Sequence, residues 1–129
     1  MIGIDSDCII DFLRGKKEAI NIIEKYKDEL VTTELNIFEV FIGLYRKKEL
    51  REKEEEITKN FFESLDILDC TGFGLKGADI FSELINEGKE IEQNDCLIAS
   101  ILLVNGCDKI ITKNVKHFSR IKNIKVINY

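Results

Sequence analysis

NDCLIASILLVNGCDKIITKNVKHF, residues 94–118, is the stretch of sequence that decides the fold. Its first half predicts an apolar helix that begins at Asn94 and ends at a glycine, the residue that most often follows a last helical turn. Its second half predicts a buried strand, Ile110-Ile111, followed by Thr112 and Asn114. In open α/β sheets, ligands bind where strands end and helices begin. The stretch therefore predicts an α/β fold with a site at this turn.

The rest of the chain alternates strands and helices in the same way. Short apolar runs predict strands at Met1–Ile4, Leu30–Thr32, Asp66–Cys70 and Lys125–Ile127. Apolar spacing predicts helices from Ser6 or Asp7 to Gly15, at Lys17–Tyr26, at Thr33–Lys48, around Ile57–Leu65 after a charged connection at Arg51–Glu56, and at Leu75–Glu87. This alternation predicts right-handed crossovers, and hence a three-layer α/β/α sandwich around a mostly parallel sheet of four to five strands.

Length and composition place the chain among globular proteins. Its 129 residues predict one domain, and its hydrophobic content of 44% is enough for a real core. No apolar run approaches the roughly 20 residues that span a membrane. The start, residues 1–5, lacks the basic and apolar regions of a signal peptide, so we expect the protein in the cytoplasm, with no membrane contact.

The four cysteines argue against a zinc site, because none forms a C-x-x-C pair and the chain contains one histidine. Three of them lie in or beside predicted helices and strands, so we expect buried, reduced thiols. The cysteines are Cys8, Cys70, Cys96 and Cys107.

Charge is unevenly distributed along the sequence. The net charge of −5 argues against a nucleic-acid partner, but residues 109–129 hold six Lys or Arg and no Asp or Glu. The first 108 residues therefore hold 13 basic and 24 acidic side chains, a balance of −11. A solvated basic edge and an RNA-binding edge both remain open. The candidate phosphate contacts are Lys113, Lys116, Arg120 and Arg46.

Four polar residues are candidates for one site. Asp5 follows the first strand, Glu39 faces inward from the third helix, Asp95 lies in a first helical turn, and Asn114 follows the fourth strand. Two carboxylates about 4 Å apart repel by roughly 4 kcal/mol at an effective dielectric of about 20. A hard divalent cation such as Mg²⁺ would offset this repulsion and could activate water for phosphodiester hydrolysis.

These residues carry a resemblance that covers nearly the whole chain. Asp5-Ser6-Asp7 after a strand, Glu39 with Gly43 in a helix, Asn94-Asp95-x-Leu97-Ile98-Ala99 and Thr112-x-Asn114-x-x-His117-Phe118 resemble the motifs of PIN domains. The nearest resemblance is to the VapC toxins of toxin–antitoxin pairs.

The resemblance implies an endoribonuclease that depends on Mg²⁺ or Mn²⁺. The family's acids would fall on Asp5, Glu39 and Asp95, with Asp5 and Asp95 as metal ligands and Asn114 where the family often has Asp. The supporting residues would be Ser6, Thr112 and Asn36. The resemblance also implies a homodimer and inhibition by a small VapB-like antitoxin. It does not say which RNA is cut.

Asn114 has a consequence for metal binding, because it lowers the formal charge of the site from −4 to −3 relative to a four-acid version. An amide can still bind through its oxygen. We expect one well-held metal ion, with any second ion arriving with RNA.

Five further features have weaker assignments. Two roles are open for Asp7, a contact to metal-bound water and the cap of its helix. Asp11, one turn later, is expected to face solvent. His117 is expected to be structural and Phe118 to fill the core. The dimer surface is expected on the helices around Phe38–Tyr45 and Phe61–Leu65, which have apolar residues on more than one side.

Three alternatives match part of the sequence pattern. A response-regulator receiver domain has similar length and an acid pair after its first strand, but it would leave Glu39 and Asp95 without a role and would need a phosphoacceptor such as Asp69. A haloacid-dehalogenase-type phosphatase would match Asp5-x-Asp7, but the chain is short for that class and has Ile9 where a small or hydroxyl residue is expected. A PIN fold could also serve only as a binding or assembly module.

Overall fold

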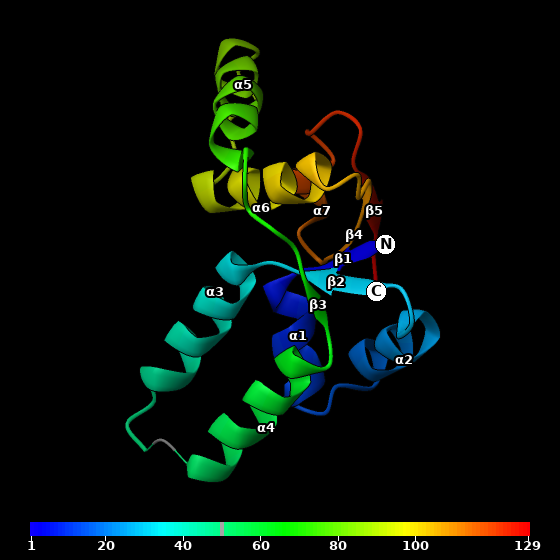
Figure 1. Cartoon of the computed structure of the whole chain (residues 1–129), viewed down its shortest axis with the longest axis vertical. Coiled ribbons are helices and arrows are strands. Elements are labelled where there is room, and N and C mark those ends of the chain that lie inside the picture. Colours follow the sequence, from blue (N-terminus) through cyan, green and yellow to red (C-terminus); the bar gives the residue numbers. More distant parts are fainter. Residues whose placement is uncertain (50) are drawn as a thin grey trace.

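The computed structural model describes residues 1–49 and 51–129, and these form an α/β/α sandwich (Figure 1). The strands are β1 (Ile2–Ile4), β2 (Leu30–Thr32), β3 (Asp66–Ile67), β4 (Lys109–Ile111) and β5 (Lys125–Ile127). The helices are α1 (Ser6–Leu13), α2 (Lys17–Tyr26), α3 (Glu34–Tyr45), α4 (Glu52–Glu63), α5 (Phe73–Asn86), α6 (Gln93–Val104) and α7 (Val115–Phe118).

The sheet has the strand order β3-β2-β1-β4-β5, and every pairing is parallel. β1 is therefore central. The chain adds β2 and β3 on one side of it and then crosses to add β4 and β5 on the other. The switch point between β1 and β4 is where ligands bind in such sheets. Receiver domains have the order 2-1-3-4-5 instead, so the topology excludes that alternative.

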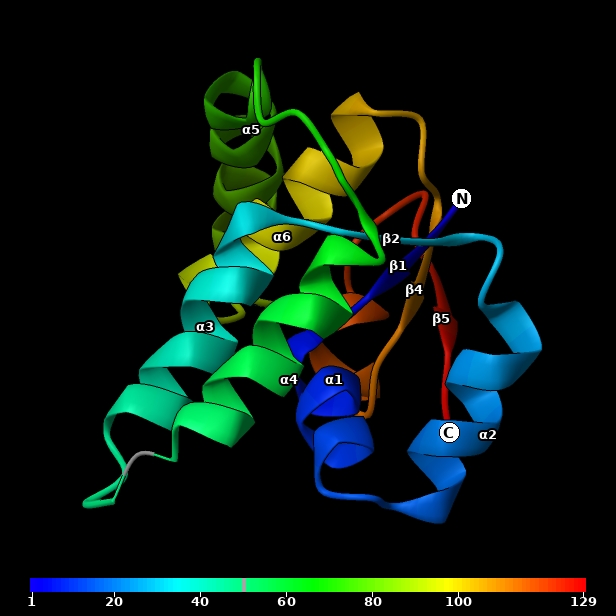
Figure 2. The ribbon, with the colours of Figure 1, turned by 60° about the horizontal axis from the view of Figure 1, so that its bottom comes forward.

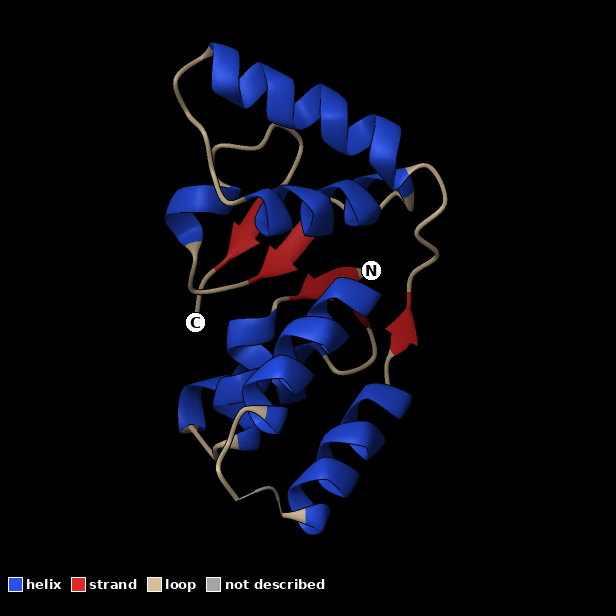
Figure 3. Ribbon diagram, turned by 90° about the vertical axis from the view of Figure 1, so that its left-hand side faces the viewer, coloured by secondary structure: helices blue, strands red, loops and turns tan. Residues whose placement is uncertain are grey.

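Side chains of successive strand residues point to opposite faces of the sheet and create two cores. Val31 and Ile110 face the core beneath α5 and α6, while Leu30 and Ile111 face the core beneath α1 to α4. Figure 3 shows the sheet between these two helix layers. Phe118 is fully buried in the first core, as expected from the sequence.

Helices α3 and α4 form an arm that projects beyond the sheet (Figure 2). Phe41 of α3 packs against Phe62 of α4 with ring centroids 6.0 Å apart. A shallow groove of about 550 Å³ lies along this arm and is lined mainly by apolar side chains.

Several predicted boundaries were wrong at helix ends. Asp5, not Ser6 or Asp7, caps α1. α3 ends at Tyr45, three residues before the predicted end. The predicted charged connection at Arg51–Glu56 is mostly the first turn of α4, where acidic side chains favour the positive end of the helix dipole.

The third strand and the focal helix also differ from prediction. β3 contains two residues rather than the five predicted at Asp66–Cys70. α5 begins at Phe73, two residues before the predicted start. α6 begins at Gln93 with Glu92 in the cap position, so Asn94 lies inside its first turn. None of the helices in the described part of the chain is long and apolar enough to cross a membrane.

Candidate active site

Asp5 is the centre of the candidate site. β1 ends at Ile4, and the backbone of Asp5 is extended so that its side chain can cap α1 by accepting a hydrogen bond from the Ser6 N–H at 2.9 Å. The same oxygen, Oδ1, accepts from Asn36 Nδ2 at 3.3 Å, and Oδ2 accepts from the Thr112 hydroxyl at 2.8 Å. Asp5 is 6% exposed, so three donors orient a nearly buried carboxyl group.

A chain of hydrogen bonds connects Glu39 to this centre. Thr33 caps α3 and donates through its hydroxyl to Asn36 Oδ1 at 2.7 Å. Asn36 Nδ2 donates to Ser6 Oγ at 3.0 Å, and Ser6 Oγ donates to Glu39 Oε1 at 2.7 Å. Each member donates to the next, so the orientation of Glu39 is set from the cap of its own helix.

Asp95 lies in the first turn of α6 and is 7% exposed. Its Oδ2 accepts from Asn114 Nδ2 at 2.8 Å and lies 2.8 Å from His117 Nδ1, which donates to it when protonated at that nitrogen. The backbone N–H of Asn114 donates to Thr112 Oγ1 at 2.9 Å. A short chain of hydrogen bonds therefore links Asp95 to Asp5 across the switch point.

Asp7 binds the loop after β4. Its Oδ2 accepts from the Lys113 N–H at 2.9 Å and lies 3.2 Å from the Thr112 hydroxyl, while its Oδ1 is buried and has no hydrogen-bond partner among the described residues. The contact to this loop replaces the helix-capping role that the sequence left open for Asp7.

Burial raises the pKa of the carboxyl groups at this site. Burial raises the pKa of Asp5 to about 7, and the neighbouring charges of Asp7 and Asp95 add to the rise, while hydrogen bonds from Thr112 and Ser6 oppose it. Burial also raises the pKa of Asp7 and of Asp95. The charge of Glu39 adds to the rise at Asp95, so these carboxyl groups are close enough to repel one another.

The donor set fits a hard divalent cation that keeps several waters. Within residues 1–49 and 51–129, no Lys or Arg forms an ion pair with Asp5, Glu39 or Asp95. In the same described residues, no three His, Cys, Asp or Glu side chains are grouped so that together they could hold a metal ion. Mg²⁺ needs only one or two carboxylates with waters in the remaining positions. Asp5 and Asp95 could provide these, with the amide oxygen of Asn114 nearby.

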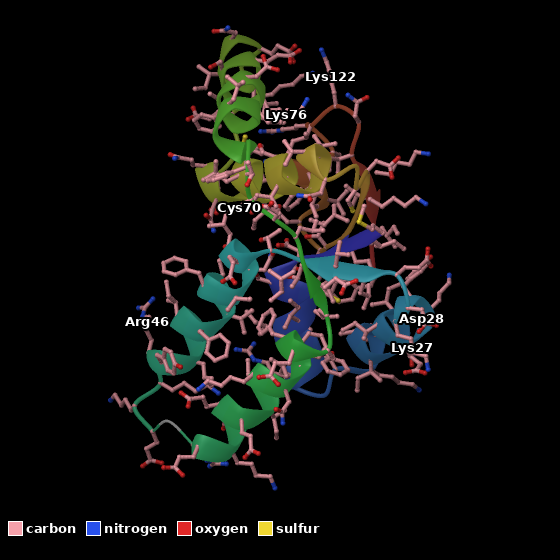
Figure 4. The ribbon with its side chains drawn as sticks, viewed as in Figure 1. Lys27, Asp28, Arg46, Cys70, Lys76 and Lys122 are labelled. Carbon is pink, nitrogen blue, oxygen red and sulfur yellow. The ribbon has the colours of Figure 1, made fainter. Side chains whose placement is uncertain are left out.

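The four candidate RNA-binding residues come from two parts of the chain, Arg46 after α3 and the other three from residues 113–120. Lys113 forms an ion pair with Asp11, with Nζ 2.7 Å from Oδ2. Arg120 donates to the backbone oxygen of Glu90 at 2.9 Å, and Lys116 is exposed on α7. Figure 4 shows Arg46 on the α3 side of the molecule, and Lys122 at the opposite end beside α5.

Two residues beside the site have contacts that the sequence pattern did not predict. Asp11 is 7% exposed and paired with lysines, so the prediction that it faces solvent was wrong. The i, i+4 spacing of Asp7 and Asp11 was a signal that both lie on one face of α1. The hydroxyl of Tyr129 also donates to Asp11, at 2.9 Å, and no local pattern predicts that contact.

All four cysteines are free thiols. Cys8, Cys96 and Cys107 are buried, as predicted, and Cys70 is exposed in the connection between β3 and α5 (Figure 4).

Comparison with known proteins agrees with this fold. The PIN domain model matches residues 2–124. The structure of VapBC2 from Rickettsia felis bound to a promoter DNA fragment aligns with a TM-score of 0.87 at 22% identity, over 100% of this chain and 99% of that chain. DNA-bound VapBC from Salmonella typhimurium aligns with a TM-score of 0.85 at 20% identity, over 99% and 98%.

A third structure, VapBC-1 from nontypeable Haemophilus influenzae, aligns with a TM-score of 0.83 at 23% identity, over 99% of this chain and 98% of that chain. At these identities the likeness establishes the fold. No curated protein matches the sequence.

Proposed function

The chain belongs to the PIN domain family, and from this premise we propose that it is a Mg²⁺- or Mn²⁺-dependent endoribonuclease that hydrolyses RNA phosphodiester bonds. PIN domains are generally nucleases. The observation that carries the proposal is that hydrogen bonds through neutral side chains link Asp5, Glu39 and Asp95 around the switch point, without a Lys or Arg partner in the described part of the chain. A cluster of this kind favours a cation and, through it, a phosphate.

In this proposal Asp5 and Asp95 hold the ion, and Glu39 and Asn114 complete the catalytic group. A bound divalent cation supplies polarisation of a phosphate oxygen and activation of water. Ser6 and Asn36 orient Glu39, and Thr112 orients Asp5, through hydrogen bonds of 2.7 to 3.0 Å.

His117 belongs with the positioning residues in this proposal. Its contact with Asp95 Oδ2 orients one oxygen of that carboxyl group, and Oδ1 is the oxygen proposed to bind the ion. Asn114 fixes the same Oδ2 from its amide nitrogen. In this proposal His117 has a structural role, as expected from the sequence, because it positions Asp95.

Lys116, Arg120 and Arg46 are the proposed contacts to RNA phosphates. Neutralising phosphates releases counterions, so each contact adds to the salt sensitivity of binding. Lys116 is the closest of the three in sequence to Asn114, and it is exposed.

We further propose that the protein is the toxin of a VapBC-like pair and is inhibited by a small antitoxin. The support is the likeness to structures of VapBC complexes. A cationic segment of such a partner would complement the acidic site and exclude substrate.

A homodimer through the α3–α4 arm is proposed as well. Phe38 and Tyr45 are 60% and 52% exposed, and both line the groove along the arm. Apolar side chains grouped in this way are typical of protein interfaces.

The decisive experiment compares RNA cleavage by the wild type, Asp5→Asn and Asp95→Asn with Mn²⁺, Mg²⁺ or EDTA. Asp79→Asn, an exposed change on α5, is the matched control. We expect the wild type and Asp79→Asn to cut only with metal, and both site variants to lose at least about 100-fold in rate, a loss of about 2.7 kcal/mol in transition-state stabilisation.

Equal cutting by all four proteins would indicate a contaminating nuclease and contradict the proposal. Metal binding without cutting of any RNA tested would instead favour the non-catalytic PIN module. A calorimetric titration of Mn²⁺ into the same four proteins separates that outcome from loss of the metal site.

A further inference from the structure

Lys113 is held at both of its ends by one face of α1. Its backbone N–H donates to Asp7 Oδ2 at 2.9 Å, and its ammonium group lies 2.7 Å from Asp11 Oδ2. Asp7 and Asp11 are four residues apart, so they lie one above the other on the helix. Both carboxylates therefore contact one residue, Lys113, in the loop between β4 and α7.

The ammonium group of Lys113 lies beside Asp11 and the ring of Tyr129. Asp11 also lies 3.1 Å from Lys16 Nζ and accepts from the Tyr129 hydroxyl at 2.9 Å. The Lys113 ammonium lies 5.0 Å from the centroid of the Tyr129 ring, a cation–π distance. Chiefly because of the hydrogen bond from Lys113, the pKa of Asp11 is lowered to about 2.

The residues on either side of Lys113 belong to the candidate site. Thr112 donates to Asp5 Oδ2 at 2.8 Å, and Asn114 donates to Asp95 Oδ2 at 2.8 Å. The Asn114 N–H in turn donates to Thr112 Oγ1. Fixing Lys113 therefore fixes the two side chains that reach Asp5 and Asp95.

We infer that Lys113 is a positioning residue and not an RNA contact: Asp7 and Asp11 hold it so that Thr112 and Asn114 are set against the carboxyl groups of the site. This inference rests on the proposed function for the role of the site in metal binding and catalysis. The role of Lys113 rests on the contacts above. It replaces the RNA-binding role that the basic segment suggested.

The competing role has a physical cost. To bind a phosphate, the ammonium group would leave a carboxylate that is 7% exposed and lose its place against the Tyr129 ring. Asp11 would then keep only Lys16 and the Tyr129 hydroxyl as partners, so the move would cost one ion pair to a nearly buried carboxylate. Lys113 and Lys116 are both exposed, but Lys116 has no such contact in the described structure, so it is the matched residue for comparison.

The first test is amide hydrogen exchange in the metal-free protein, measured for Lys113→Met, Asp11→Asn, Lys113→Arg and Lys116→Met. We expect exchange at residues 113 and 114 to become at least about 10-fold faster in the first two variants, because a loosened loop opens more often. Lys113→Arg retains the charge, and we expect its exchange to be as slow as in the wild type. Lys116→Met is expected to match the wild type.

The second test uses RNA binding in EDTA, where no metal-dependent cleavage occurs, and calorimetric Mn²⁺ binding without RNA. Lys113→Met should leave the slope of log affinity against log salt unchanged, whereas Lys116→Met should reduce it by about 0.7 per lost phosphate contact. Lys113→Met and Asp11→Asn should each weaken Mn²⁺ binding about 10-fold or more, and the double variant should lose little further.

A reduced salt slope in Lys113→Met with unchanged exchange and Mn²⁺ affinity would overturn the inference and return Lys113 to RNA binding. If the wild type bound neither Mn²⁺ nor RNA, the proposed function would fail. The exchange rates would then still decide whether Lys113 holds the loop, because they need neither ligand.

Discussion

At the scale of single residues, the site is built by neutral donors that surround acids. Asp5 receives hydrogen bonds from a backbone N–H, an amide and a hydroxyl, and none of these donors is charged. Such donors orient a carboxyl group without neutralising it. Burial then leaves Asp5 with a pKa of about 7 in the absence of a cation.

Asp5→Asn is therefore predicted to stabilise the metal-free protein at high pH. The Asp5 carboxyl has an ordinary pKa of 3.8 and a folded pKa of about 7. Between these values the folded protein holds a proton that the unfolded chain releases, so the wild type loses stability as pH rises through this window. We expect Asp5→Asn to melt on the order of 5 °C higher at about pH 8 and near the wild type at about pH 4.

The measurement is thermal unfolding in EDTA and again with Mn²⁺, with Asp79→Asn as the control. Mn²⁺ should raise the melting temperature of the wild type and of Asp79→Asn, but not that of Asp5→Asn. A melting temperature of Asp5→Asn below that of the wild type at about pH 8 would contradict the assigned burial effect.

Asn114→Asp is predicted to change both stability and the number of metal ions. The substitution replaces the amide that donates to Asp95 Oδ2 with a fourth carboxylate. Without metal, the like charges should lower the melting temperature at neutral pH. With Mn²⁺, calorimetry should change from one tight site in the wild type to two, and a wild type with two tight sites would refute the hypothesis of a single well-held ion.

At the scale of elements, the central strand and α6 set the position of the site. α6 brings Asp95 to the edge of β1 because the helix can lie directly on the sheet at Gly3. A Cβ at this glycine would lie 2.7 and 2.8 Å from the two methyl carbons of Leu102, which is fully buried. The sequence placed a glycine in a buried strand, and the structure gives the reason as close approach of the helix.

Gly3→Ala should therefore destabilise the protein by about 1–3 kcal/mol, because an added methyl group overpacks a full core. Gly43→Ala is the matched control, since its Cβ would meet nothing within 4 Å on α3. That change should stabilise by up to about 1 kcal/mol through helix propensity. Urea unfolding checks both, and equal effects of the two substitutions would contradict the close approach of α6.

At the scale of the whole molecule, the acidic site and the apolar arm occupy different parts of the surface. The acidic site lies at the switch point of the sheet, while the groove of the α3–α4 arm is lined by exposed aromatic and aliphatic side chains. In the proposed function the first would bind a cation and a phosphate, and the second would bind another protein chain.

Phe38→Glu is predicted to convert the proposed dimer to a monomer, because a charge at the groove would be buried without a partner. Leu75→Glu is the control, since Leu75 is 85% exposed on α5 outside this groove. Light scattering during size-exclusion chromatography measures the mass of each variant. Dissociation by Leu75→Glu alone would instead place the interface on α5.

The sequence by itself determined the elements and the acids, because both depend on local pattern. Strand and helix periodicity predicted every strand position and the parallel sheet. Asp5 and Asn114 each follow a predicted strand. Because the carboxyl ends of parallel strands lie at one edge of the sheet, the sequence predicted that these two residues lie close together.

Only the tertiary structure decided which side chains hold those residues in place. Asp11 is four residues from Asp7 in sequence, but its partners Lys113 and Tyr129 are separated from it by more than a hundred residues. The start of α6 was also missed, because Glu92 is in the cap position without a side-chain cap hydrogen bond, so no capping residue marks it in the sequence. The contacts of Asp11 cannot be predicted from local sequence pattern, since they form only when β4, β5 and α1 have come together in the folded protein.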